Sequence, residues 1–154
     1  MVGKVGKDLT EEEAYTAAQL CGLNMIATLK SASLARLQWR SRTLAHQRRA
    51  LPLHPLIVFD TILILSPPSH PRPRRVLHAA ELGDLDRVKR IVKVVGFVNC
   101  VDEFAGQPGV VNGCSDLMAD VFGERGVHAR SAVGTNALPL NIPVEIEAVV
   151  EIEE

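Results

Sequence analysis

The sequence contains few cysteines and no long apolar run. Three of its 154 residues are cysteines, and none of them forms a CxxC pair. An odd number of scattered cysteines argues against a disulfide framework and against a structural zinc site, and it favours a reducing compartment, the cytoplasm or alternatively the mitochondrion. The longest apolar stretch, residues 56–65, contains Asp60 and is shorter than the roughly 20 residues that cross a membrane. We therefore expect no membrane segment, and the first eight residues show no signal peptide.

An excess of charge of either sign is also absent, since the formal net charge is −1, and charge therefore favours no class of partner. One segment departs from this balance. Residues 34–79 contain eight arginines, no lysine, one acidic residue and six of the nine prolines. Those prolines exclude a long helix. The chain therefore divides into residues 1–33, an unusual segment at 34–79, and residues 80–154.

Three interpretations of segment 34–79 remain open. Its arginines together with Trp39 offer charge and a stacking surface for RNA. It could instead be a solvated loop, or translated non-coding sequence such as a retained intron. Connections this long without regular structure are uncommon inside a compact domain. That rarity favours the third interpretation, and we expect the segment to be disordered.

The flanking parts predict an α+β domain. Thr10 followed by Glu13 is a capping box, and apolar residues at helical spacing come after it, so a helix is expected over residues 11–31. The Val- and Ile-rich run from Val88 to Val98 predicts a buried strand. Together these patterns place one helix before segment 34–79 and one strand after it.

A second helix and two short strands are predicted in the last third of the chain. Pro108 suits the first turn of a helix, an apolar stripe follows it, and Gly123 or Gly126 would end it. Residues 130–134 form one expected strand. Residues 143–153 form the other, in which apolar residues alternate with glutamates. One face of the sheet should therefore pack under helices while the other carries carboxylates.

Several motifs resemble the RidA/YjgF family, which is also called L-PSP endoribonuclease. The similar stretches are HARSAV (128–133), LPL (138–140), VEIEA (144–148), LGDLDRV (82–88), QP (107–108) and VNG (111–113). Residues 80–154 match almost continuously, and residues 3–33 resemble the segment around the family's first helix. The resemblance implies a chorismate-mutase-like α+β fold, with two helices on one face of a sheet, and a homotrimer with sites between subunits. It also implies that the strands that open the family's fold should precede this chain's first residue.

The resemblance implies a deaminase that hydrolyses reactive 2-imino or 2-enamino acids to 2-keto acids and ammonia, with no cofactor and no metal. Arg130 would bind the carboxylate of a small-molecule substrate through a two-pronged contact that lysine cannot make. Glu145 would be the catalytic residue that positions the attacking water, and Asn112 would also bind the substrate. We expect Arg130 and Glu145 at the edges of two neighbouring strands.

Simpler interpretations stand beside these roles. Arg130 could form a surface ion pair, Glu145 could be one solvated acid among several, Asn112 could cap a helix, and His128 could be a surface histidine rather than a ligand contact. Two other functions stay open. One is an endoribonuclease, although RNA is the less favoured partner because the arginine-rich segment lies outside the matching residues. The other is a non-catalytic trimeric ligand-binding module or an inactive truncated product.

Overall fold

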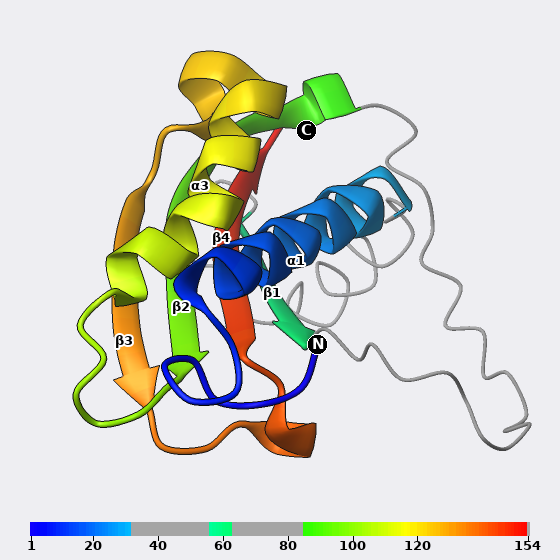
Figure 1. The fold of residues 1–154 in the computed structure, drawn as a ribbon. Helices are drawn as coiled ribbons and strands as arrows, with labels where there is room; N and C mark the ends of the chain where they lie inside the picture. The colour runs from blue at the N-terminus through cyan, green and yellow to red at the C-terminus, as the bar shows by residue number, and fades with distance from the viewer. Residues whose placement is uncertain (32–55, 63–84, 154) are drawn as a thin grey trace, which may run out of the picture.

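The computed structural model describes residues 1–31, 56–62 and 85–153, in which two helices lie against one face of a sheet (Figure 1). The helices are α1 (Glu11–Ser31) and α3 (Gln107–Phe122). The strands are β1 (Leu56–Ile62), β2 (Val88–Asn99), β3 (Ala129–Thr135) and β4 (Val144–Ile152). This is the α+β arrangement that the sequence predicts, and the bounds of α1 agree with the predicted helix.

The strand order in the sheet is β1-β4-β2-β3. β4 pairs antiparallel with both β1 and β2, and β2 pairs parallel with β3. β3 is therefore an edge strand. The expectation that Arg130 and Glu145 lie on neighbouring strands is wrong, because β2 runs between β3 and β4. A parallel neighbour requires a long crossover, and α3 supplies the crossover between β2 and β3.

β1 lies inside segment 34–79, and the sequence did not predict it. Its register with β4 runs from Leu56 opposite Glu151 to Ile62 opposite Glu145. The structure describes no other residue of that segment. The three interpretations of the segment concern residues outside the described ones and stay predictions. One strand of the sheet is therefore contributed by a segment that the sequence patterns left out of the domain.

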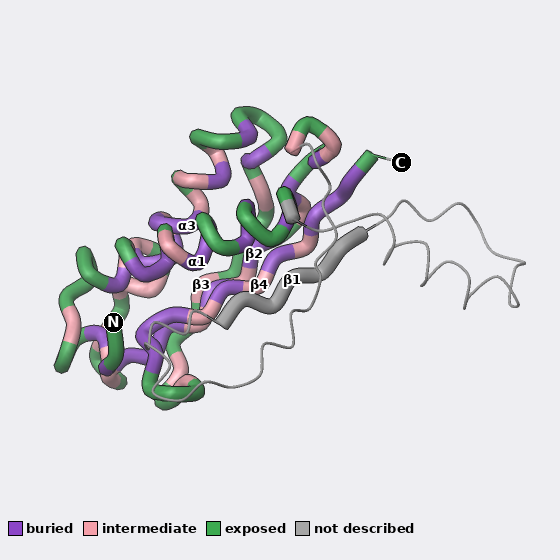
Figure 2. Tube along the Cα trace, turned by 90° about the vertical axis from the view of Figure 1, so that its right-hand side faces the viewer, coloured by how far each residue is buried: buried purple, intermediate pink, exposed green. Residues whose placement is uncertain are grey.

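The core lies between the helices and the sheet (Figure 2). The predicted stripe of α1 is confirmed, since its members are all buried: Ala14, Ala17, Cys21, Met25 and Leu29. On β4, Val144, Ile146 and Ala148 are buried between half-buried neighbours, as a strand with one face under helices requires. In the part of the chain that the structure describes, neither helix is long and apolar enough to cross a bilayer.

Local contacts fix the two helices. The capping box is confirmed, because the Thr10 amide donates to Glu13 Oε2 at 2.8 Å and the Glu13 amide donates to Thr10 Oγ1 at 3.2 Å. α3 crosses α1 closely at Gly113, where a β-carbon would collide with the backbone carbonyl oxygen of Tyr15. Glycine at this position therefore sets the distance between the helices.

An ion cluster lies at the start of β2. The register of β2 against β4 shifts between Val88 and Arg90, so Lys89 is an extra residue in the strand. Both basic side chains reach the same carboxylate: Lys89 Nζ lies 2.7 Å from Glu151 Oε1, and Arg90 Nε lies 2.8 Å from Oε2. Hydrogen bonds from Lys89 and Arg90 outweigh burial and lower the pKa of Glu151. The bulge thus provides a buried carboxylate with two partners.

Candidate functional site

Arg130 projects from edge strand β3 toward α3. Its register partner on β2 is Val94, which is fully buried, so Arg130 leaves the sheet on the face that the helices cover. Its Nη1 donates to Asn112 Oδ1 at 2.7 Å and to Ser115 Oγ at 3.2 Å. The structure therefore brings together two of the three residues that the resemblance singled out.

Asn112 lies within the second turn of α3. The residue that precedes the helix is Gly106, and it makes no side-chain capping bond, so Asn112 is not a helix cap. Because arginine has only donors, the amide oxygen of Asn112 must face the guanidinium. Asn112 thus orients Arg130.

The Arg130 guanidinium keeps donors for a ligand. Arginine carries five N–H groups, and the two on Nη1 are the ones directed at Asn112 and Ser115. Nε and Nη2 have no hydrogen-bond partner among the described residues, and the side chain is exposed. Together they form the edge of the guanidinium that receives a carboxylate through two parallel hydrogen bonds.

Ser115 and His128 complete the group. The sequence analysis weighed His128 as a ligand contact but did not select Ser115. His128 Nε2 lies 3.1 Å from Ser115 Oγ, and its Nδ1 lies 2.6 Å from the carbonyl oxygen of Gly126. A carbonyl only accepts, so Nδ1 carries the proton and, in the neutral ring, Nε2 accepts from the Ser115 hydroxyl. The three-residue spacing of Asn112 and Ser115 on a helix was the signal that could have linked them.

These side chains line a shallow cavity of about 270 Å³. The described lining residues are Asn112, Ser115, Asp116, Ala119, Gly126, Val127, His128 and Arg130. Its volume falls just below the roughly 300–1,000 Å³ of drug-sized ligand sites, so a small ligand fits it best. The cavity joins an anion-binding group, a hydroxyl and an imidazole.

Glu145 does not lie at this cavity. It is half-buried on β4, and its register partner on β2 is Phe97, which in turn pairs with Val133 of β3. Val133 is three residues from Arg130 along β3, so the two side chains leave opposite faces of the sheet. Within one chain the structure therefore separates Glu145 from Arg130, and the proposed role of Glu145 stays a prediction.

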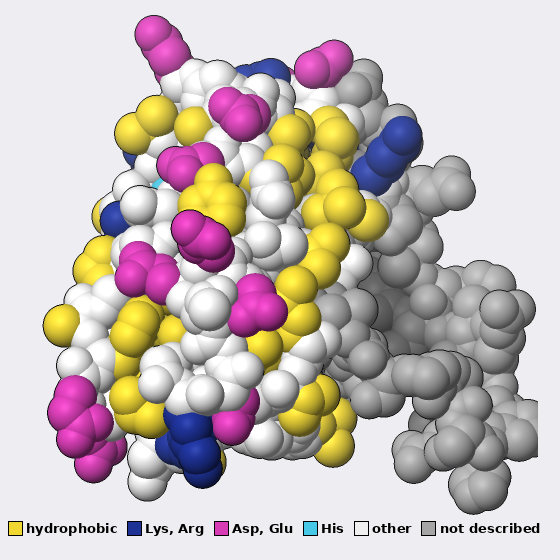
Figure 3. Space-filling model, viewed as in Figure 1, with side chains coloured by type: hydrophobic (Ala, Val, Ile, Leu, Met, Phe, Trp, Pro, Cys, Tyr) yellow, Lys and Arg dark blue, Asp and Glu magenta, His cyan; other side chains and the backbone are white. Residues whose placement is uncertain are grey.

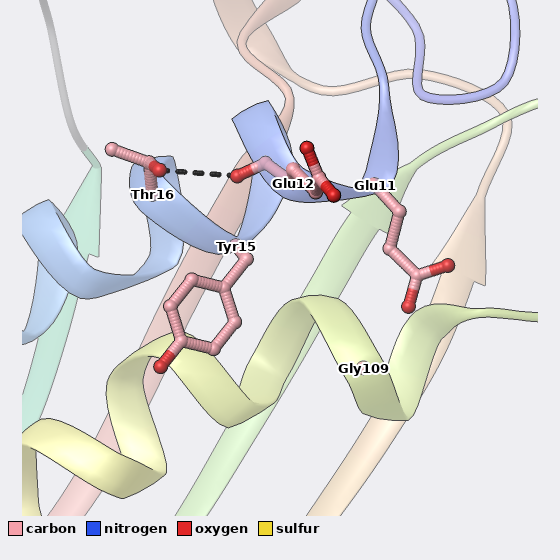
Figure 4. Close-up of a pocket in the computed structure, with 5 residues that line it drawn as sticks. All are labelled: Glu11, Glu12, Tyr15, Thr16 and Gly109. Atoms are coloured by element: carbon pink, nitrogen blue, oxygen red, sulfur yellow. Dashed lines mark hydrogen bonds between the residues drawn. The ribbon is translucent and has the colours of Figure 1, made fainter.

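A second hollow, of about 480 Å³, lies where α1 begins beside α3 (Figure 4). Its described lining residues are Glu11, Glu12, Tyr15, Thr16 and Gly109. Tyr15 donates its hydroxyl to Asp116 Oδ2 at 3.0 Å, and Asp116 also lines the Arg130 cavity. This bond and the proximity of Asp116 raise the pKa of the Tyr15 phenol. The hollow is acidic and offers no donor for an anion comparable to Arg130.

The three cysteines are core thiols. Cys21, Cys100 and Cys114 are buried and unbonded to one another. Burial raises the pKa of the Cys21 and Cys114 thiols to about 12, so neither forms a thiolate at neutral pH. Among the described residues no cluster of three His, Cys, Asp or Glu side chains could hold a metal ion. The Arg130 cavity brings together a guanidinium, an amide, a hydroxyl, an imidazole and a carboxylate.

Comparison with known proteins identifies relatives of both the sequence and the fold. Protein TCP17 of Trypanosoma cruzi is 55% identical over 74 residues, which are 47% of this chain and 46% of that protein. The chain thus spans about half the length of this curated relative. The crystal structure of the protein Atu1372 from Agrobacterium tumefaciens, of unknown function, is also similar. It is 32% identical, and the likeness covers all of this chain and 68% of the Atu1372 chain with a TM-score of 0.63.

A second solved structure confirms the fold. A Shewanella oneidensis protein described as a candidate endoribonuclease is 22% identical, and the likeness covers 98% of this chain and 68% of that one with a TM-score of 0.61. The family model of endoribonuclease L-PSP matches residues 73–152. That range contains β2, α3, β3 and β4, with the whole Arg130 cavity. The chain therefore belongs to the endoribonuclease L-PSP family, the family also called RidA/YjgF.

Proposed function

We propose that this domain hydrolyses small 2-imino or 2-enamino acids to 2-keto acids and ammonia, with Arg130 binding the substrate carboxylate. The observation that carries the proposal is the anchored guanidinium of an exposed residue: Nη1 is held by Asn112 at 2.7 Å, while Nε and Nη2 have no hydrogen-bond partner among the described residues. A carboxylate bound there in a two-pronged contact would have one orientation. Its neighbouring imine carbon would then lie in the cavity.

Orientation supplies much of what this reaction needs. An imine carbon is already electrophilic, and a fixed position relative to a bound water removes most of the entropic barrier to attack. The remaining requirement is a group that takes a proton from the water and returns one to the leaving nitrogen. The cavity places side chains capable of proton transfer within hydrogen-bonding distance of one another.

A homotrimer is part of the proposal. β3 is an edge strand whose residues are mostly exposed, and an uncovered strand edge favours pairing or packing with another chain. Because Glu145 and Arg130 leave opposite faces of one sheet, Glu145 can act on a molecule held by Arg130 only from another copy. A cleft between subunits is the arrangement in which both residues could meet one substrate.

RNA cleavage, which the family name suggests, has less support. Asp and Glu side chains are spread over the helical face of the molecule (Figure 3), and Asp116 lines the cavity itself. Phosphate backbones bind where several cations gather. Of the described lining residues, Arg130 is the one permanently charged cation. The cavity thus suits one carboxylate better than a polyanion.

The direct test is ammonia release from a 2-imino acid generated in place by an amino acid oxidase. The wild-type chain should accelerate release above the spontaneous rate, and Arg130→Lys should remove most of that acceleration, because lysine keeps the charge but loses the fork. Arg87→Lys is the matched control, since Arg87 binds the Glu153 carbonyl at 2.8 Å and does not line the cavity. A wild-type chain that binds the acid without accelerating release would be a ligand-binding module, and the proposal would fail.

A further inference from the structure

We propose that Ser115 and His128 form the proton relay of this site, with Ser115 contacting the attacking water and His128 storing its proton. This inference rests on the proposed deaminase function and names the groups that would perform its acid–base step. Both residues line the same cavity as Arg130. His128 opens the HARSAV motif and Ser115 lies outside the family-like motifs, and the resemblance assigns a catalytic role to neither residue.

The geometry gives each group one role. The Gly126 carbonyl, 2.6 Å from Nδ1 of His128, fixes the proton on that nitrogen and leaves Nε2 as an acceptor. Nε2 lies 3.1 Å from Ser115 Oγ, so the serine hydroxyl donates to the imidazole. A nucleophile or water-binding hydroxyl, a base, and a group that orients the base are the three parts of an acid–base relay.

Arg130 links the relay to the substrate. Its Nη1 donates to Ser115 Oγ at 3.2 Å, from the same guanidinium whose other edge would hold the carboxylate. Ser115 Oγ therefore lies directly beside the binding group and retains a lone pair that can accept from water. The nearby positive charge also stabilises developing negative charge on that oxygen. Asp116 on α3 is the acidic side chain among the described residues of the lining.

The transfers balance without any added reagent. The imine reacts in its protonated form: water forms a bond to its carbon while the electron pair of the C=N π bond moves to nitrogen, which becomes a neutral amino group. The water gives one proton to Ser115 Oγ, and the serine proton passes to Nε2 of His128. In the second half the relay returns its proton to the amino nitrogen and the C–N bond breaks, with its electron pair leaving on ammonia. The carbonyl forms as the remaining hydroxyl proton is released to solvent, and this release replaces the proton that the imine took up before the reaction. Imine and water become 2-keto acid and ammonia, and both side chains regain their starting states.

Glu145 cannot serve this purpose from within the same chain, because it leaves the far face of the sheet. Ser115 and His128 come from α3 and from the residue before β3, so they are supplied by the chain that supplies Arg130. The relay is therefore complete in one subunit, whatever a neighbouring copy adds. An experiment can therefore distinguish this relay from a proton-transfer group that a neighbouring subunit supplies.

The test measures kcat and KM for ammonia release with Ser115→Ala and His128→Ala in the full chain. Each variant should lower kcat by about 100-fold, the scale of general acid–base catalysis, and should leave KM nearly unchanged because Asn112 still holds Arg130. Added imidazole should restore part of kcat in His128→Ala and none in Ser115→Ala. Ser131→Ala is the matched control, since Ser131 is exposed on β3 and lies outside the cavity lining.

The outcomes distinguish the two proposals. If the wild-type chain releases no ammonia, the deaminase function itself is wrong and the relay falls with it. If the wild-type chain is active and both variants keep its kcat, the relay is wrong while the function stands. His128→Gln, which retains a side-chain amide near the Gly126 carbonyl, replaces His128→Ala if the latter fails to fold, and it should show the same loss of kcat.

Discussion

Arg130 Nη1 donates to the side-chain oxygen of Asn112 at 2.7 Å, across the boundary between edge strand β3 and helix α3. This bond holds an exposed guanidinium in one orientation before any ligand arrives. Arginine side chains carry large rotamer entropy, and a guanidinium that is already ordered loses less of it on binding. The bond is therefore the feature that distinguishes Arg130 from an ordinary surface arginine.

Asn112→Asp should weaken substrate binding. A carboxylate at this position would pair with the guanidinium and compete electrostatically with the carboxylate of the substrate. An exposed ion pair contributes up to about 1 kcal/mol, so we expect KM to rise by roughly fivefold with little change in kcat. Asn24→Asp, an exposed position on α1, makes the same change of charge away from the cavity and should leave KM unaltered. A lower KM for Asn112→Asp would contradict the assignment of Arg130 as the carboxylate-binding group.

Glu145→Gln should lower kcat only in the assembled oligomer and not in the monomer. Because Glu145 and Arg130 lie on opposite faces of one sheet, the carboxylate can reach a bound substrate only from a second copy. Measuring kcat over a concentration series, with the oligomeric mass determined at each point, checks this. A loss of kcat that is equally large in a monomeric population would show that Glu145 acts within its own chain.

Glu151 should make stability depend on acid pH. Hydrogen bonds from Lys89 and Arg90 lower the pKa of Glu151 in the native state below the ordinary value of 4.5. Its contribution is therefore fully present above pH 4.5 and is lost as pH falls through the lower native pKa. The difference in Tm between wild type and Glu151→Gln should be largest near neutral pH and should shrink on acidification. A difference that grows below pH 4.5 would mean that the carboxylate is not stabilised by this pair.

Gly113→Ala should destabilise the fold, although alanine is the better helix former by roughly 1 kcal/mol. The added β-carbon would meet the Tyr15 carbonyl where α3 crosses α1. Overpacking of this kind costs about 1–3 kcal/mol, so the free energy of unfolding should fall in urea melts. A gain in stability would show that the helices can separate at this crossing without loss.

The local elements were predictable because each has its own pattern. The capping box at Thr10 and the apolar spacing after it located α1, and the alternation from Val144 located β4. Strand order was not predictable from such patterns, because the pairing of β2 between β3 and β4 depends on contacts distant in sequence. β1 was missed because its apolar run is embedded among prolines and arginines.

The candidate site was predictable only in part. The family resemblance pointed to Arg130 and Asn112, and the structure brings these two together. His128 was weighed as a ligand contact against a surface histidine, and Ser115 was not selected. Their contact joins the middle of α3 to the residue before β3, and no local pattern pairs these two positions. The alternation from Val144 placed Glu145 on the face away from the helices, but the separation of Glu145 from Arg130 depended on strand order and register, which sequence alone does not establish.

The central claim is that Arg130 binds the substrate carboxylate, and a substrate-side comparison tests it most directly. Ammonia release would be measured for a 2-imino acid and for its carboxamide analogue, with the wild-type chain and with Arg130→Lys. We expect the wild-type chain to show a much higher kcat/KM for the acid than for the carboxamide, and Arg130→Lys to lose most of that preference. Equal discrimination by both proteins would contradict the account, because the carboxylate would then be recognised by another group.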